Sequence, residues 1–286
     1  MLTFDRLPAR FLGCYGNEDA ATPAFDWLAA ESVVFEFHYC EHAAAEAPGH
    51  AWWTGRHHFP HPREVQRGFP SLTCSLAAAG GRTILVSERD AAPLAPPFGE
   101  TIEVGGREGL SVEADETPFA RLIDAAEEQL AGLVVSESRP WLLWLRSRGV
   151  PVPWVPPPEF LVEQMLQAGG PEAFESDDEE LEEPPEALPG KPPGNGNPAG
   201  DGAGGIAAAL LEALATPAML RATRKDPDLF LQAAEASRFL YSACVRMLDR
   251  ELGRLRTAIE HACGEGPLLF IVTAALGQSL GETVLR

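Results

Sequence analysis

The sequence predicts an α/β fold in which a largely parallel sheet is flanked by helices on both faces. Short apolar runs of strand length alternate along the chain with segments of helical periodicity, and this alternation is typical of parallel sheets covered by helices. The predicted strands are Leu2 to Phe4, Val33 to Tyr39, Thr83 to Ser87, Trp141 to Leu145 and Leu268 to Thr273. The last three are apolar on both faces, which indicates strands buried inside the sheet.

Two of the predicted helices begin at a threonine that is followed by proline. The hydroxyls of Thr22 and Thr117 are suited to cap a helix, and the proline at the next position lacks an N–H that would need a partner. We expect the second of these helices to run to about Leu130 and to stop at Gly132.

The longest predicted helix runs from about Asp228 to Cys263. One face carries apolar side chains spaced three and four residues apart, which predicts packing against a core. These side chains are Val245, Leu248, Leu252, Leu255 and Ile259. The charged residues of the opposite side are Arg246, Asp249, Arg250, Glu251 and Arg254. We expect Asp249 to lie on the solvated side and to pair with Arg246 or Arg250.

The composition is strongly acidic. The 286 residues carry 42 acidic and 22 basic side chains, which gives a formal net charge of −20 and a pI of about 4.7. Such a surface does not favour nucleic acid or an anionic membrane as a partner, because both require basic side chains. The sequence shows neither a signal peptide nor an apolar run long enough to span a bilayer, so we expect a cytoplasmic protein.

Five cysteines are scattered along the chain without CxxC spacing. An odd number without metal-binding spacing predicts reduced thiols, buried as small apolar residues, rather than disulfides or a zinc site.

An acidic segment divides the chain. Residues Glu172 to Glu186 contain nine carboxylates and no basic side chain, and Pro189 to Gly205 is nearly all Pro, Gly, Asn and Ala. This composition buries too little apolar surface to offset the entropy of ordering, and it lacks the spacing of a calcium loop. We therefore predict a mobile insertion at 171–205 between two parts of one α/β domain, 1–170 and 206–286.

Several segments, in the correct order, resemble motifs of the sulfatase family within the alkaline-phosphatase superfamily. A strand ending in Asp5 is followed by the turn LGCYGN, the helix TPAFDWLA and a strand containing phenylalanine. The later segments are AEAPGHAWWTGR, SLAAAGGRTILVSE, PWLLWLRSRGVPVPW, YSACVRMLDRELGRL and LLFIVTAALG. The resemblance runs from Met1 to about Gly277 and implies the sulfatase-like α/β fold, truncated at the C-terminus.

The resemblance also implies a specific chemistry. In active sulfatases, a cysteine or serine in the motif Cys-x-Pro-x-Arg is oxidised to formylglycine, whose hydrated aldehyde attacks the sulfate sulfur. A calcium ion, held by carboxylates of the first strand and of an Asp-His-Gly turn, polarises the sulfate oxygens.

Most of these positions differ in this chain. Alignment on Thr54-Gly55-Arg56 puts Glu46 at the nucleophile position and His50 at the arginine position. Glutamate has no thiol or hydroxymethyl group to oxidise, so formylglycine cannot form there. Asp5 is retained at the metal site, whereas the Asp-His-Gly turn reads Ala275-Leu276-Gly277. One carboxylate does not hold calcium, so we expect no metal and no other cofactor.

The retained and altered residues each allow two interpretations. Glu46 is either a new acid, base or nucleophile, or a carboxylate that a helix N-terminus tolerates. Asp5 is either the ligand of an ion or a structural relic paired with Arg6, Arg10 or Arg56, and we favour the relic.

The sequence therefore predicts a sulfatase-like protein that is catalytically inactive and has a binding or structural role. The alternative is an active hydrolase of sulfuric or phosphoric esters, with Glu46 as acid or base, His50 as anion contact and Arg56 in support. The sequence does not name a partner, although another protein chain that covers exposed sheet edges is one option.

Overall fold

The computed structural model describes residues 1–40, 46–56, 71–89, 91, 97–108, 112–136, 139–150, 152–168, 216–264, 266–278 and 280, without the side chains of 46, 47 and 134–136. The predicted insertion at 171–205 lies outside these residues. Within the described part of the chain, no helix combines the length and the apolar character that crossing a bilayer requires.

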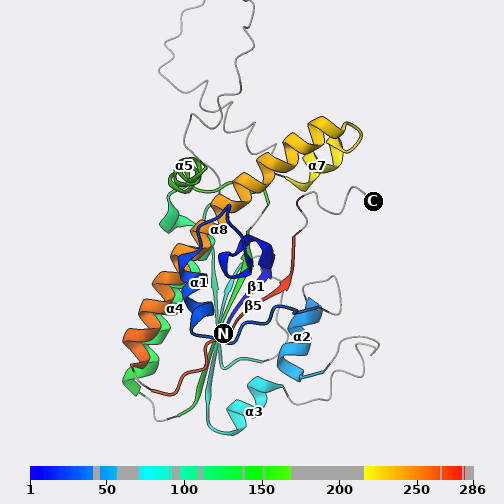
Figure 1. Ribbon diagram of the computed structural model, residues 1–286. Coiled ribbons are helices and arrows are strands. Elements are labelled where there is room, and N and C mark those ends of the chain that lie inside the picture. The colour runs from blue at the N-terminus through cyan, green and yellow to red at the C-terminus, as the bar shows by residue number, and fades with distance from the viewer. Residues whose placement is uncertain are drawn as a thin grey trace, which may run out of the picture.

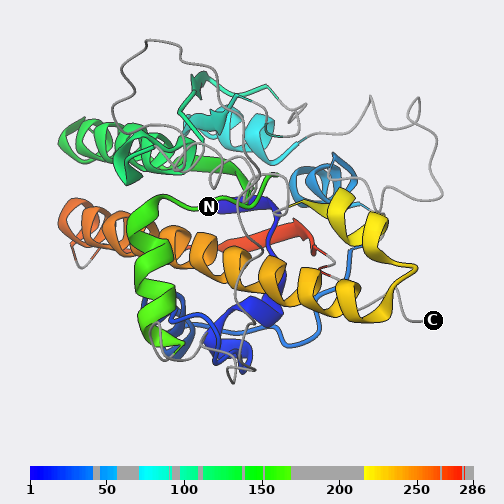
Figure 2. The ribbon, with the colours of Figure 1, turned by 90° about the horizontal axis from the view of Figure 1, so that it is seen from above.

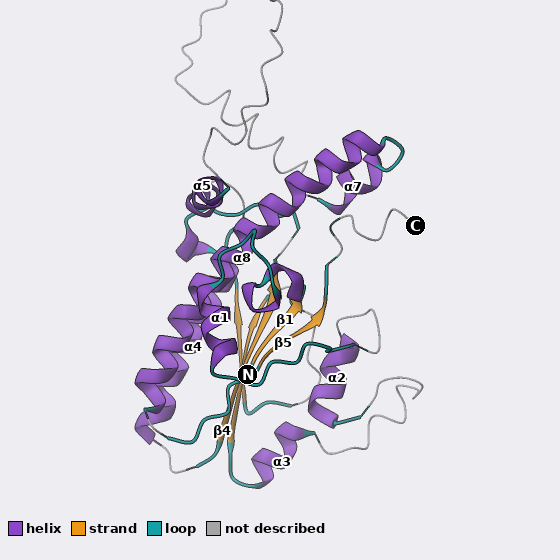
Figure 3. Ribbon diagram, in the orientation of Figure 1, coloured by secondary structure: helices purple, strands orange, loops and turns teal. Residues whose placement is uncertain are grey.

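The described strands form one parallel sheet, drawn in orange in Figure 3. Their order is β3-β2-β4-β1-β5. They are β1 (Leu2–Arg6), β2 (Arg82–Glu88), β3 (Glu100–Val104), β4 (Trp141–Gly149) and β5 (Val272–Leu276). Every pairing is parallel, so the carboxyl ends of the strands meet at one edge of the sheet. The predicted parallel sheet is confirmed.

Helices cover both faces of the sheet, also as predicted (Figure 1). One face carries α1 (Pro23–Ala30), α4 (Pro118–Ser136) and α8 (Pro227–Cys263), and we name it the α8 face. The other, the α2 face, carries α2 (Glu46–Thr54) and α3 (Leu72–Ala78). Helices α5 (Pro158–Gln167) and α7 (Pro217–Thr223) contact α8. Short 3-10 helices are formed by Ala9–Phe11, Gly13–Tyr15 and Ala114–Glu116.

The alternation of side chains along the strands gives each face its own core. On the α8 face, Leu145 of β4 belongs to the main apolar cluster, in which the ring of Phe4 lies 5.6 Å from that of Phe119 in α4. On the α2 face, Trp144 of β4 packs against Trp53 of α2, with ring centroids 6.3 Å apart. Neighbouring residues of one strand thus reach opposite cores.

Several boundaries differ from those predicted. Strand β4 continues past Leu145 to Gly149, and β5 begins only at Val272. Helix α4 passes through Gly132 and ends at Ser136. A single glycine inside a helix costs only about 1 kcal/mol relative to alanine, which tertiary packing offsets. Strand β3 was not predicted, because only Ile102 and Val104 of its five residues are apolar and the segment contains no apolar run.

The segment Val33 to Tyr39, predicted as a strand, does not form one. It leads from α1 on one face toward α2 on the other (Figure 2). Its apolar side chains are largely exposed, with 81% of Val33, 77% of Phe37 and 82% of Tyr39 accessible to solvent. β-Branched and aromatic residues favour strands only where pairing and packing partners are present.

The prediction for Asp249 was wrong. The apolar stripe of α8 is buried as expected, but Asp249 and Glu251 on the supposedly solvated side are also buried. The Asp249 carboxylate accepts hydrogen bonds from the backbone N–H groups of Ala24 (3.2 Å) and Phe25 (2.9 Å), so it caps the N-terminus of α1. Helices on several sides of α8 bury more of its circumference than one stripe predicts.

All five cysteines are unpaired, as predicted. Their expected burial holds for Cys244, whereas Cys40 and Cys74 are exposed. Local structure explains the exposure of both thiols. Cys40 directly follows the exposed segment Val33 to Tyr39, and Cys74 lies on the first turn of α3.

Replacing Phe37 by alanine should change the free energy of unfolding by less than about 0.5 kcal/mol, because little of its surface is buried. Phe119→Ala is the matched control and should cost about 3–5 kcal/mol, because this ring lies in the main core. Urea denaturation measures both. Comparable losses would show that the Val33 to Tyr39 segment is packed into the fold.

Candidate functional site

The carboxyl edge of the sheet gathers the buried charged residues of the strands. In open parallel sheets, ligands bind outside the carboxyl ends of the strands. Asp5 lies near the end of β1, Glu88 ends β2, and Arg146 lies near the end of β4. Counted over the whole residue, main chain included, each of the three is at most 9% exposed. Strand alternation sends Asp5 and Arg146 to the α2 face and Glu88 to the α8 face.

Asp5 and Arg146 form an ion pair on the α2 face. The Nη2 atom of Arg146 lies 2.7 Å from Oδ1 of Asp5, and the two side chains are 1% and 13% exposed. The sequence predicted that Asp5 pairs with Arg6, Arg10 or Arg56. The structure pairs it with Arg146, which was not among these candidates.

The described residues at Asp5 do not fit the calcium ion that the resemblance implies. Phe4 aligns with Ala274 and Arg6 with Leu276, which puts Ala275 beside Asp5. The side chains of Ala275 and Leu276 supply no oxygen, whereas calcium takes six to eight oxygen ligands. The Arg146 guanidinium, 2.7 Å from the Asp5 carboxylate, also repels a cation. The described residues contain no cluster of three or more His, Cys, Asp or Glu suited to a metal.

Helix α2 carries the positions that correspond to the sulfatase nucleophile motif. It begins at Glu46, whose side chain is not described. The His50 ring lies edge-on to Trp53, and its Nδ1 atom is 3.4 Å from the Thr54 hydroxyl, which donates to the His50 carbonyl. Arg56 follows the C-terminal end of the helix and is exposed. Since a nine-residue helix is about 13 Å long, Glu46 and Arg56 are held apart.

Backbone contact joins β4 to β1 at this edge. Gly149, which pairs with Arg6, has a φ of 78°. A Cβ atom at this position would lie 2.0 Å from the carbonyl oxygen of Arg6. Both the left-handed backbone conformation and the lack of space require glycine here.

Glu88 is a buried carboxyl group on the α8 face. It accepts hydrogen bonds from the Ser147 hydroxyl (2.7 Å) and from the backbone N–H of Arg148 (3.1 Å). Burial raises the pKa of Glu88 from its ordinary 4.5 to about 7, against the lowering effect of both hydrogen bonds and of the Arg148 charge. The charge of Asp5 raises this pKa further. Glu88 therefore exchanges a proton near neutral pH.

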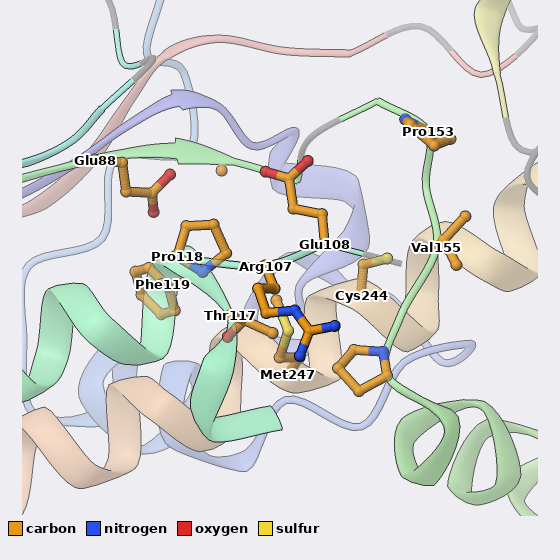
Figure 4. A pocket seen from close by; sticks show the side chains of 12 residues that line it. Glu88, Arg107, Glu108, Thr117, Pro118, Phe119, Pro153, Val155, Cys244 and Met247 are labelled. Atoms are coloured by element: carbon orange, nitrogen blue, oxygen red, sulfur yellow. The ribbon is translucent and has the colours of Figure 1, made fainter. Parts of the chain in front are cut away.

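Glu88 lines a small cavity between the sheet edge, α4 and α8 (Figure 4). The cavity has a volume of about 30 Å³, which suits one water molecule. Its other walls include Arg107, Glu108, Cys244 and Met247. Arg107 is ion-paired with Glu116 at 3.0 Å and Glu108 with Arg148 at 2.7 Å. The charges at the cavity mouth are thus already neutralised by protein groups.

Sequence reasoning did not identify Arg146 or Glu88 as site residues. Arg146 directly follows the predicted strand Trp141 to Leu145, and Glu88 directly follows the predicted strand Thr83 to Ser87. Both strands were predicted to be buried on both faces. Extension of the strands by one residue would have placed both charges in the interior. This is the signal that could have revealed them.

The sequence matches no protein-family profile and no curated protein. Its structure is similar to three solved structures at 12 to 16% sequence identity. The phosphonate monoester hydrolase of Agrobacterium radiobacter matches with a TM-score of 0.55, covering 91% of this chain and 58% of that chain. The C-terminal periplasmic domain of EcEptC from Escherichia coli, in complex with Zn, gives a TM-score of 0.56 over 99% of this chain and 64% of that chain.

The third structure is BT4656 in complex with its substrate D-glucosamine-2-N,6-O-disulfate, with a TM-score of 0.56 over 99% of this chain and 66% of that chain. The chain shares its fold with these three structures, an α/β fold with a parallel sheet between helices. This confirms the α/β fold that the sequence predicted. The chain spans between 58 and 66% of the length of these three structures.

The titration of Glu88 predicts a pH dependence of stability. Because the folded-state pKa is raised to about 7, the folded protein holds a proton that the unfolded chain releases above pH 4.5. Stability should therefore fall as the pH rises from 4.5 to 7, by about 3 kcal/mol for this group. Glu88→Gln should lose this part of the pH dependence.

The measurement is urea denaturation of both proteins between pH 4.5 and 8. The other titrating groups are the same in both proteins, so the difference between the two curves isolates Glu88. Parallel curves would show that the carboxyl titrates normally in the folded state.

Proposed function

We propose that this chain is a sulfatase-like protein that does not hydrolyse esters and acts through a binding or structural role. Its fold supports the sulfatase-like part of the proposal. The observation that carries the loss of activity is the register of β1 with β5, which sets apolar Ala275 and Leu276 beside Asp5 and Arg6. Ala275 and Leu276 stand where the Asp-His-Gly turn would help to hold a metal, and their side chains contribute no ligand.

The nucleophile segment supports the same proposal. Glu46 at the start of α2 has no group from which formylglycine could form. Two of the structures with the same fold are described as a phosphonate monoester hydrolase and as a complex with a glucosamine disulfate substrate. Sulfuric and phosphonic esters are therefore the substrates on which a remaining activity has to be sought.

A binding role is supported by the apolar side chains that the fold leaves exposed. Val33, Phe37 and Tyr39 lie close together in the sequence and are each more than three quarters exposed. If these side chains form one contiguous patch in solution, they provide the kind of apolar surface through which proteins bind partners.

The proposal predicts that the purified protein hydrolyses neither an aryl sulfate, a phosphonate monoester nor a glucosamine sulfate above the uncatalysed rate. The assay is run with added calcium, with added zinc and with EDTA. Asp5→Ala and Glu46→Gln are measured in parallel as variants of the metal and nucleophile positions.

Two results would contradict inactivity. Calcium-dependent turnover that Asp5→Ala abolishes would show a working metal site. Turnover that Glu46→Gln abolishes, without loss of stability, would instead support the ester hydrolase in which Glu46, His50 and Arg56 form a rearranged site.

A further inference from the structure

Arg146 is positioned by the sheet to neutralise Asp5. The strand register aligns Arg146 with Thr3 of β1 and with Ser87 of β2. Asp5 lies two residues beyond Thr3 and therefore on the same face of the sheet. The guanidinium spans this diagonal and approaches the carboxylate to 2.7 Å.

The surroundings of Arg146 exclude most of the water that would otherwise stabilise its charge. Its side chain is 1% exposed. Trp144, two residues earlier on the same face, belongs to an aromatic cluster with Trp53 and Phe98. A charge in such surroundings is strongly unfavourable without a close counterion, so Arg146 and Asp5 stabilise each other.

We infer that the Arg146 guanidinium replaces the divalent cation that the fold implies at Asp5, so that this end of the sheet is stable without metal. The inference rests on the proposed function, because both take the site at Asp5 to bind no calcium. It goes further, because it assigns the positive charge to a residue of the chain. A guanidinium donates hydrogen bonds but offers no coordination position, so it neutralises Asp5 without acting as a Lewis acid.

The test compares the melting temperatures of the wild type, Asp5→Asn, Arg146→Met and the double variant. Arg146→Met removes the cation that lies 2.7 Å from the Asp5 carboxylate and should lower the melting temperature by roughly 10 °C. The double variant should melt higher than Arg146→Met alone, because both charges of the ion pair are then removed together. Additive losses in the double variant would overturn the inference.

The matched control is the pair Arg148 and Glu108. It has a similar distance of 2.7 Å, but its side chains are 25% and 35% exposed. Because solvent screens this pair, Arg148→Met and Glu108→Gln should combine additively within about 2 °C. A coupling as large as that of Asp5 with Arg146 would overturn the distinction between the two pairs.

Metal addition provides the second readout. Millimolar calcium and EDTA should leave the melting temperature of the wild type unchanged, and a rise with calcium that Asp5→Asn abolishes would overturn the inference.

If Arg146→Met alone does not fold, a folded double variant supports the coupling and an unfolded one contradicts it. Ester hydrolysis by the wild type would contradict the proposed function and leave this coupling untouched.

Discussion

The alternation of side chains along β4 is the constraint on which the arrangement of the carboxyl edge depends. This central strand sends Arg146 to the α2 face and Ser147 to the α8 face. Its parallel neighbours β1 and β2 bring Asp5 and Glu88 to the matching faces. Two carboxylates at the same edge therefore meet different partners, a guanidinium in one case and a hydroxyl with a backbone N–H in the other.

The buried acids of this fold are accommodated in three different ways. Asp5 is opposed by a charge of the chain itself. Glu88 is bound by neutral donors, and burial raises its pKa toward neutrality. Asp249 caps the first turn of α1, and burial raises its pKa to about 6 despite these hydrogen bonds. The ion pair favours the charged form of Asp5. Glu88 and Asp249, by contrast, have raised pKa values, so their protonation changes with pH near neutrality.

The sequence predicts the fold well because its strongest signals are local. The buried strands around Thr83 and Trp141 and the helix starts at Pro23 and Pro118 each depend on neighbouring residues only, and the structure contains them. The expected hydroxyl cap forms at Thr117, which accepts a hydrogen bond from the Ala120 N–H, but not at Thr22, because Asp249 caps that helix instead. The strand predicted at Val33 to Tyr39 is wrong for the opposite reason. A strand needs a neighbouring strand to pair with, and the residues of the segment itself do not show whether one is present.

The candidate site was predicted less completely. The register of β1 with β5 aligns Leu276 with Arg6 and so puts Ala275 at the level of Asp5. The partner of Asp5 could not be predicted, because Arg146 is 141 residues away along the chain and meets Asp5 only through the order of the strands. Glu88 and Asp249 were missed because burial by other elements, rather than their own neighbours in the sequence, sets their environments.

Gly149 has a consequence for how the carboxyl edge responds to change elsewhere. Since its backbone lies directly against the Arg6 carbonyl, the separation of β4 from β1 at this point is fixed by main-chain atoms. Asp5 directly precedes Arg6, so this main-chain contact also sets how far the β1 backbone beside Asp5 lies from β4, the strand that carries Arg146.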